Sequence, residues 1–303
     1  MKLFLKFRLV FCIQVFLVVS LFSCGTTAVK EEDTTHTKGV LKVMADDTFR
    51  PILGTSIETF EAIYPSTKVT ISYATQEKSI DALLKGEVDF ILSGRKLNKN
   101  EEAQVRNRGL FLKVNQLASD ALVFIVSKEN KKIDITEAEL VDIVNGKHKK
   151  SLIIDKSSSS NLVYLKDKLK LPLNLTNVTA AGSDSAVIEY VSSHPEAIGI
   201  IGMALVSDQE DSKVKSRLGK IDIMTVSYKD SLGNTIKAEV SLDAIATKRY
   251  PFIRDIFIIN LDGSMNLGTG FANFLVGEMG QRIILKAGLL PYQLPNREII
   301  ISK

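Results

Sequence analysis

Short apolar segments alternate with polar turns and helical patterns along most of this chain. In the first example, residues 42–45 are apolar at alternate positions and lead into Asp46, Asp47 and Thr48, residue types that favour a helix N-cap. Pro51 is tolerated near a first helical turn, and apolar residues then recur at helical spacing. The sequence therefore predicts a strand that ends in a polar turn and feeds directly into a helix.

The same order of strand, polar turn and helix recurs along the chain. The further polar turns lie at residues 74–78, 93–95, 155–160 and 182–185. Strands that alternate with helices of about ten residues favour a parallel, doubly wound sheet, in which ligands bind beyond the carboxyl ends of the strands. Each helix start also offers free backbone N–H groups and the positive end of a dipole, so each is a candidate anion site.

Other segments have patterns that predict single elements. Residues 110–114 and 121–126 each read as a strand, and residues 269–286 read as one long helix. The segment 197–202 reads as a strand with two glycines, whose spacing is more typical of close packing than of a phosphate loop.

The N-terminal 23 residues have the pattern of a signal peptide. Lys2, Lys6 and Arg8 precede an apolar run over residues 9–22, which is shorter than the roughly 20 residues that a membrane-spanning helix needs. Residues 21–25 resemble a bacterial lipobox, in which Cys24 would become the lipidated N-terminus of the mature chain. The alternative is a chance cysteine after a cleavable signal peptide.

Cysteine usage and charge limit the function further. Cys12 lies in the removed segment and Cys24 would carry lipid, so the mature domain has no disulfide available. The formal net charge is +4, and removal of the three N-terminal basic residues leaves 36 basic against 35 acidic side chains. This balance argues against a nucleic-acid binder and against a general membrane-surface binder.

Residues 24–37 are polar and read as a tether. We therefore expect a protein of the bacterial cell envelope, facing the periplasm or the surface, that contacts the membrane only through its lipid.

The order of the motifs resembles the periplasmic phosphate-binding proteins of ABC transporters over nearly the whole mature chain. No single motif is decisive, but their collinear series is specific. The motifs are Asp47-Thr48-Phe49, Val88-Asp89-Phe90 followed by Ser93 and Arg95, residues 118–128, residues 135–146, residues 155–159, residues 182–185 with 195–199, residues 250–254, and Phe274-Leu275 with Gly280-Gln281 and Gly288.

The resemblance implies an α/β fold of the type II periplasmic-binding-protein kind with two lobes. Each lobe would be a doubly wound, mostly parallel sheet, with lobe I formed by residues 38–117 and 241–303 and lobe II by residues 118–240. The chain would cross between the lobes twice, near residues 117–120 and 240–243, and two crossings form a hinge that closes on a ligand.

The resemblance also implies a site for a dehydrated oxyanion between the lobes. In that family the anion is held by hydroxyls and backbone N–H groups at helix starts, by an arginine, and by an aspartate that accepts the ligand's remaining proton. Every oxygen of a buried anion needs a partner, because an isolated charge in a dry site is costly. The corresponding candidate ligand-binding residues are Asp47, Thr48, Phe49, Gln76, Ser93, Arg95, Ser157, Ser158, Ser159, Ser183 and Asp184.

This chain departs from the family pattern at important positions. The arginine of the phosphate site would fall at Ile153 and the proton-accepting aspartate at Gly94, and the serine run 157–159 keeps hydroxyls but loses a glycine. Arg95 would supply the missing cation, or it pairs with Glu101 or Glu102 on the surface. The acceptor would come from Asp46 or Asp47, for which plain N-capping is the alternative.

Enzymatic patterns are sparse. The three histidines, His36, His148 and His194, form no metal-ligand spacing with cysteines or carboxylates, and no nucleophile elbow or phosphate loop occurs. We therefore expect neither a metal, nor a cofactor, nor catalysis.

The resulting hypothesis is a monomeric solute-binding lipoprotein that captures phosphate or a related oxyanion for an ABC importer, with the transporter permease as its partner. Two alternatives are a different small ligand, such as an organic acid, in the altered pocket, and a surface lipoprotein that acts through protein interaction. A hydrolase is the most distant alternative.

Overall fold

The computed structural model describes residues 34–156, 159–208 and 210–294. The predicted signal peptide, the lipobox cysteine Cys24 and most of the tether lie outside this range. Within it, no helix combines the length and the apolar character that crossing a membrane would require.

The first third of the described chain follows the predicted alternation of strands and helices. Its strand β1 buries every second residue, as expected for a strand between two layers. The elements are β1 (Gly39–Ala45), the 3-10 helix η2 (Asp47–Phe49), α2 (Arg50–Ile63), β2 (Thr67–Tyr73), α3 (Gln76–Lys85), β3 (Phe90–Ser93) and α4 (Lys99–Asn107).

The rest of the chain adds strands to the same sheet and a small second sheet. The middle elements are β4 (Lys113–Ser127), β5 (Asp134–Thr136), α5 (Glu137–Val144), β6 (Ser151–Ile154), α6 (Ser160–Leu169), β7 (Val178–Ala180), α7 (Asp184–Ser193), β8 (Ala197–Gly202), η3 (Met203–Leu205) and α8 (Ser212–Leu218). The last are β9 (Ile221–Ile223), β10 (Thr225–Lys229), β11 (Thr235–Ala238), α9 (Leu242–Ala246), β12 (Ile253–Asn260), α10 (Leu267–Val276), α11 (Glu278–Lys286) and β13 (Leu290–Pro291).

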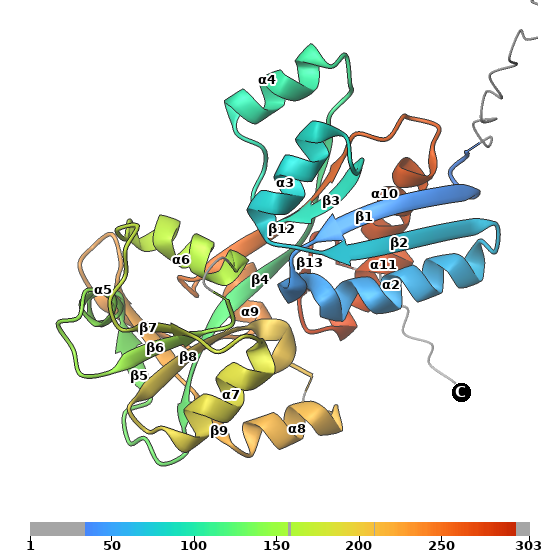
Figure 1. The fold of residues 1–303 in the computed structure, drawn as a ribbon. Coiled ribbons are helices and arrows are strands. Elements are labelled where there is room, and N and C mark those ends of the chain that lie inside the picture. Colours follow the sequence, from blue (N-terminus) through green and yellow to red (C-terminus); the bar gives the residue numbers. More distant parts are fainter. Residues whose placement is uncertain (1–33, 157–158, 209, 295–303) are drawn as a thin grey trace, which may run out of the picture. The chain divides into compact units, whose positions relative to one another are not determined.

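The main sheet is parallel toward both ends and antiparallel in its middle. Its strand order is β2-β1-β3-β12-β4-β8-β6-β7, with β13 and β9 pairing alongside β4 (Figure 1). Parallel pairs join β1 to β2 and β3, and β6 to β7 and β8. The parallel groups end in the polar turns at Asp46, Ser93, Asp155 and Gly182, which places each turn at the carboxyl edge of its own group of strands.

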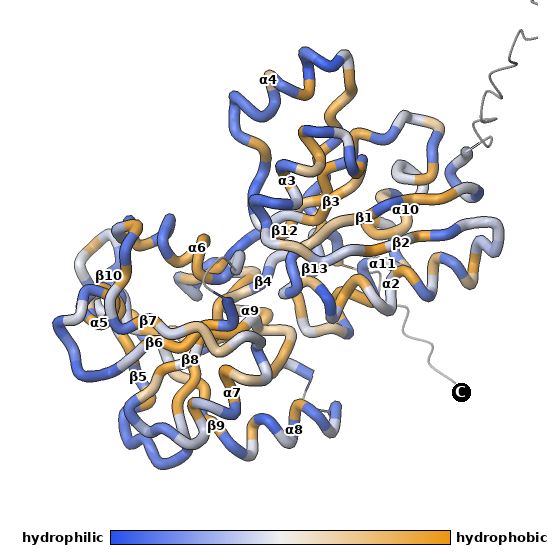
Figure 2. Tube along the Cα trace, viewed as in Figure 1, coloured by the Kyte–Doolittle hydropathy of each residue, from blue (hydrophilic) through white to orange (hydrophobic). Residues whose placement is uncertain are grey.

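The buried apolar residues form three clusters along this sheet. The largest cluster contains residues 121–126 of β4 together with β6, β8, α7 and Phe252. A second cluster contains β1, α2 and α10, and a smaller third contains α3, β3 and Val105 of α4, which is otherwise a hydrophilic helix (Figure 2). Strand β12 serves the last two clusters with its alternate faces, since Ile256 packs in one and Phe257 in the other.

Two elements differ from the sequence-based expectation. The segment 121–126 does not form a separate strand, because β4 runs without a break from Lys113 to Ser127 and pairs with β12 over most of its first half. The predicted helix 269–286 divides at Gly277, which has an extended backbone (φ −76°, ψ 171°) and starts α11 after α10. A glycine at this position adds no side-chain contact that would favour one continuous helix.

The packing also bears on the predicted second crossing. Ala244, Ile245, Tyr250 and Phe252 belong to the largest cluster, whereas Ile256 belongs to the second. The chain passes between these two apolar clusters within β12, near residues 253–256, and the lobe boundary at residues 240–243 stays a prediction.

Candidate ligand-binding cleft

The turn after β1 has the geometry that its residue types predict. Asp46 is buried and its Oδ1 accepts a hydrogen bond of 3.0 Å from the backbone N–H of Thr48, which caps the 3-10 turn that opens α2. Phe49 is buried at the same point, and Pro51 lies in the first turn of α2. Asp47 and Thr48 are partly exposed at this turn, and Arg50 pairs with Asp47.

The turn after β6 meets the turn after β1, although more than a hundred residues separate them in the sequence. The hydroxyl oxygens of Thr48 and Ser160 lie 3.0 Å apart. Lys156 forms an ion pair with Asp47. Ser159 caps α6 through a hydrogen bond from the N–H of Leu162, while Ser157 and Ser158 lie outside the described residues.

The start of α7 lies against the same space. Ser183 caps α7 by accepting a hydrogen bond of 3.2 Å from the N–H of Ala186, and Asp184 is the first helical residue. A cavity of about 590 Å³, which we call the cleft cavity, connects this helix start with the two turns above. The lining residues are Asp47, Arg50, Pro51, Asp155, Lys156, Gly182, Ser183, Asp184, Ser185, Leu205, Lys213 and Arg217.

A second and much smaller cavity lies next to the cleft cavity and shares Pro51, Asp184 and Leu205 with it. Thr48, Phe49 and Asp120 line it, and its volume of about 10 Å³ is close to the space that one water molecule needs. Asp184 therefore stands between a large cavity and an inner pocket of water size.

A buried charge pair that was not among the predicted site residues lies beside this inner pocket. Arg254 is 2% exposed and donates from Nε and Nη2 to Oδ2 of Asp120 at 3.1 and 2.7 Å. Its Nη1 donates to the Ser160 hydroxyl at 2.8 Å, and its guanidinium lies 5.4 Å from the centre of the Phe49 ring. The available signal was an arginine and an aspartate within otherwise apolar strand segments, since charged residues are almost never fully buried unless they are paired.

Several charged groups gather around Asp184. The carboxylates of Asp46, Asp120 and Asp155 and the guanidinium of Arg254 act on it from different segments of the chain, and Arg50, Lys156, Lys213 and Arg217 also line the cleft cavity. Burial raises the pKa of Asp184 to about 7, and the neighbouring carboxylates of Asp155, Asp120 and Asp46 act in the same direction against the opposing effect of Arg254. Burial likewise raises the pKa of Asp155, and Asp46 adds to the effect.

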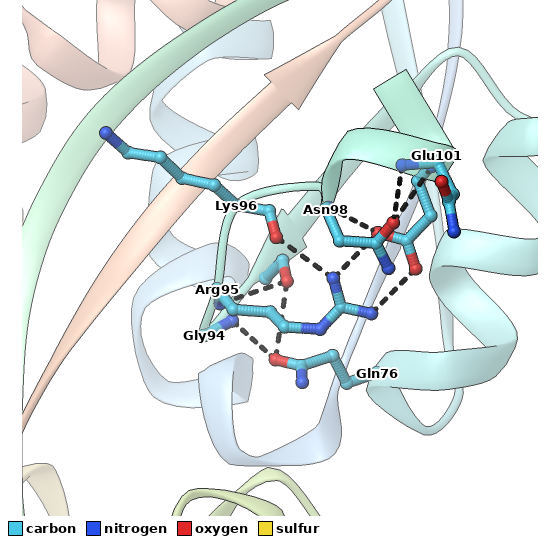
Figure 3. Close-up of polar contacts among 8 residues, drawn as sticks. Gln76, Gly94, Arg95, Lys96, Asn98 and Glu101 are labelled. Atoms are coloured by element: carbon cyan, nitrogen blue, oxygen red, sulfur yellow. Dashed lines mark hydrogen bonds and ion pairs between the residues drawn. The ribbon is translucent and has the colours of Figure 1, made fainter. Parts of the chain in front are cut away.

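Three further candidate residues form a network of their own (Figure 3). Oε1 of the buried Gln76 side chain accepts hydrogen bonds from the Gly94 N–H at 2.8 Å and from the Ser93 hydroxyl at 3.3 Å. Arg95 donates from its two terminal nitrogens to the two carboxylate oxygens of Glu101, at 2.8 and 2.9 Å. The guanidinium of Arg95 therefore has a protein partner, which was the surface alternative considered from the sequence.

The two positions that depart from the family pattern are explained by their surroundings. Ile153 is fully buried in β6 within the largest apolar cluster, so it is part of the core. A Cβ atom at Gly94 would lie 3.0 Å from Oε1 of Gln76, so Gln76 occupies the space that a side chain at this position would need.

The structure thus unites part of the predicted site. Five predicted residues line the two adjoining cavities, namely Asp47, Thr48, Phe49, Ser183 and Asp184. Ser159 caps α6, and Ser160, the first residue of that helix, contacts Thr48. Gln76, Ser93 and Arg95 contact one another instead. In the part of the chain that the structure describes, no three His, Cys, Asp or Glu side chains are arranged to hold a metal ion.

Comparisons with known proteins agree with this architecture. Residues 31–278 match the family described as PBP superfamily domain. The phosphate-binding protein PstS of Borreliella burgdorferi is 25% identical over 293 residues, which cover 90% of this chain and 97% of that protein. The crystal structure of PstS from Borrelia burgdorferi, at 26% identity, has a TM-score of 0.56 and covers 84% of this chain and 99% of its own.

More distant structures share the fold. A phosphate ABC transporter substrate-binding protein of Clostridium perfringens, solved with bound phosphate, has a TM-score of 0.69 at 18% identity and covers 84% of this chain and 100% of its own. These relatives are described as binding proteins and not as enzymes. Because the family match spans most of the sequence and the fold agrees with it, this protein belongs to the PBP superfamily, among the relatives of the phosphate-binding proteins of ABC transporters.

Proposed function

We propose that this protein is a solute-binding lipoprotein that captures phosphate or a related oxyanion in the cleft cavity for an ABC importer. The observation that carries the proposal is that the polar helix starts at Thr48 and Ser183 and the turn at Asp155 and Lys156 all line one pair of adjoining cavities. The Ser160 hydroxyl, at the start of α6, lies 3.0 Å from that of Thr48. Helix starts supply N–H donors and hydroxyls to an anion without a neutralising cation, which suits a small oxyanion. The phosphate-binding relatives support the same ligand class.

Titration calorimetry with phosphate, sulfate, molybdate and tungstate tests the proposal. We expect heat of binding with at least one of these anions, and a loss of affinity in Thr48→Val, which removes the hydroxyl that meets Ser160 and keeps the shape of the side chain. Thr59→Val is the matched control, because Thr59 lies on the adjoining helix α2 and its hydroxyl donates to the Thr55 carbonyl. If none of the four anions gives heat, the oxyanion function is wrong.

The proposed function includes two lobes and a hinge. We assign lobe I to residues 38–117 and 241–303 and lobe II to residues 118–240, with a permease of an ABC transporter as the partner. The division of the apolar residues into separate clusters along β4 and β12 supports two lobes. Small-angle scattering with and without the bound anion tests for closure, and an unchanged radius of gyration would count against a hinge.

Membrane attachment through Cys24 is part of the same proposal. The N-terminal pattern supports it, with Lys2, Lys6 and Arg8 followed by an apolar run and a lipobox-like segment. The proposed mature chain also has no cysteine other than Cys24. We expect fatty-acid labelling of the wild type and none of Cys24→Ala, which should also shift from the membrane to the soluble fraction. Gel filtration of the soluble form should give a monomer.

A second candidate function, the binding of a different small ligand, is favoured by the change at the family's arginine position. Ile153 stands where that arginine would be, and the buried Arg254 is already paired with Asp120. Native mass spectrometry of the protein purified from cells would distinguish the two candidates by the mass of the bound molecule.

A further inference from the structure

Two carboxyl groups that face the cleft cavity have oxygens without a hydrogen-bond partner. Asp155 comes from the turn after β6 and is 3% exposed, and Asp184 comes from the first turn of α7; both line the cleft cavity. The Oδ1 atoms of both side chains are shielded from solvent and make no hydrogen bond within the described residues. Buried polar atoms of this kind are costly, so their presence in a cavity indicates a partner that is not part of the protein.

Most of the neighbouring cations already have partners in the protein. Arg254 binds Asp120 with two of its nitrogens and Ser160 with the third. Lys156 and Arg50 both pair with Asp47, and Arg217 donates to the carbonyl of Leu205. Lys213 also lines the cavity, at the start of α8, and has no ion pair in the described part of the chain.

Several acidic groups face Asp155 and Asp184. Asp46 approaches both from the end of β1, and Asp120 of β4 and Arg254 of β12 approach Asp184. The Ser159 side chain and the backbone N–H of Lys156 donate to Asp155 and lower its pKa against the larger effect of burial. Two neighbouring carboxylates in a low-dielectric site do not both ionise, because the second charge is opposed by the first and by desolvation. The raised pKa of each group has the same direction as this argument.

We propose that Asp155 and Asp184 are protonated when the cleft holds an oxyanion and donate hydrogen bonds to it, so that anion capture takes up protons from solution to the extent that these carboxyl groups are ionised in the free protein. An ionised carboxylate would repel an anion, whereas a neutral carboxyl group is an O–H donor. These two groups would thereby supply the donor that Ile153 cannot. The inference rests on the proposed oxyanion function and specifies the chemistry of the same site.

The exchange of protons is measured by titrating phosphate calorimetrically at pH 7 in buffers of different ionisation enthalpy. The slope of the observed heat against buffer enthalpy counts the protons taken up. Phosphate itself contributes to this count, but its contribution cancels when the wild type is compared with Asp155→Asn and Asp184→Asn. The matched control is Glu137→Gln, since Glu137 is the first residue of α5, as Asp184 is of α7, and lies outside the cleft cavity.

We expect the wild type and Glu137→Gln to take up the same number of protons, and at least one of the two cleft variants to take up fewer. The affinity of the wild type should fall between pH 6 and 8 relative to that variant, by up to about tenfold per pH unit for each proton taken up. A carbonyl band of a protonated carboxylic acid in the infrared spectrum of the wild type at pH 6, absent at pH 9, provides a second readout that does not depend on the variants folding.

The possible outcomes distinguish proton donation by Asp155 and Asp184 from the oxyanion function itself. Heat of binding with equal proton uptake in all four proteins would overturn the role of Asp155 and Asp184 and leave the oxyanion function in place. No heat with phosphate, sulfate, molybdate or tungstate would overturn both. Binding of an amine or another cation in the absence of any oxyanion would also overturn the inference, because the ligand would then supply the positive charge itself.

Discussion

Arg254 and Asp120 occupy directly opposite positions on two antiparallel strands and form an ion pair that is sealed from solvent. The register of β12 and β4 pairs these two residues, and their side chains are 1% and 4% exposed. Cross-strand partners of opposite charge stabilise an antiparallel pair, and burial makes the loss of one partner costly because the other charge stays behind. The pair also reaches the Ser160 hydroxyl and so connects the interior of the sheet to the cleft.

Removal of this guanidinium should strongly destabilise the protein. We expect Arg254→Met to lower the free energy of unfolding in urea by about 3–5 kcal/mol, because Asp120 is left buried without its partner. The double variant Arg254→Met with Asp120→Leu should recover part of this loss. Arg282→Ala is the control, since its pair with Glu278 is exposed and contributes about 0.3–0.5 kcal/mol. Equal effects of Arg254→Met and Arg282→Ala would contradict the prediction.

The stability of the ligand-free protein should fall as pH rises from about 4 to 7. Burial raises the pKa of Asp184 from 3.8 to about 7, so within this range the folded state holds a proton that the unfolded state has released. Folding then takes up this proton, and the free energy of unfolding decreases with pH by up to about 1.4 kcal/mol per unit. Urea unfolding of Asp184→Asn should show a flatter pH profile and greater stability at pH 8. If the pH profile of Asp184→Asn is identical to that of the wild type, the pKa of Asp184 is not raised. The control Glu137→Gln should have the pH profile of the wild type.

The ion pair between Lys156 and Asp47 should affect titration more than stability. Burial alone would raise the pKa of Asp47, but hydrogen bonds from Lys156 and Arg50 outweigh it and lower the pKa below 3.8. The stabilisation by this group is therefore present above pH 4 and is lost as pH falls below that value. We expect Lys156→Met to raise the pKa of Asp47 in an NMR titration and to cost less than about 1 kcal/mol of unfolding free energy, because the pair is partly exposed.

The control for this variant is Lys170→Met, which removes an exposed partner of Asp167 on α6 and should leave the titration of Asp47 unchanged. If both variants change the Asp47 titration equally, the contact with Lys156 is not its cause.

Gln76 should be important for folding of the turns after β2 and β3. Gln76→Leu leaves the Gly94 N–H and the Ser93 hydroxyl without their acceptor, which should cost about 1–3 kcal/mol of unfolding free energy. Gln104→Leu on the exposed face of α4 should change stability by less than about 0.5 kcal/mol. Chemical denaturation of the two variants measures the difference, and similar midpoints would show that the Gln76 network contributes little.

The parts of the fold that depend on neighbouring residues could be read from the sequence. The turn at Asp46 and Thr48 was predicted because capping residues and Pro51 act within a few positions of the chain, and the start of α7 at Ser183 followed for the same reason. The continuity of β4 could not be predicted, because it depends on pairing with β12, which begins more than a hundred residues later.

In the candidate site, too, the local features were predicted and the features that depend on tertiary contacts were not. Hydroxyl and carboxyl groups at helix starts were identified from local patterns, and the structure brings Thr48 together with the turn after β6. Arg254 was missed because its motif suggests an ordinary strand, and only the tertiary fold reveals that its guanidinium reaches Ser160. Arg95 was predicted as the cation of the site because the sequence alone does not show whether its guanidinium contacts a ligand or pairs with a nearby carboxylate. In the structure it pairs with Glu101.

The uninterrupted strand β4 has a mechanical consequence. It contributes Leu117 to one apolar cluster and Phe124 to another, and β12 accompanies it with a register shift between Ile256 and Phe257. Any bending between these clusters must therefore deform a hydrogen-bonded strand ladder. Such a ladder opposes the bending and returns to its original geometry, whereas a loose linker would permit free rotation. Amide protons of the ladder on either side of that shift should accordingly exchange slowly even while the cleft opens.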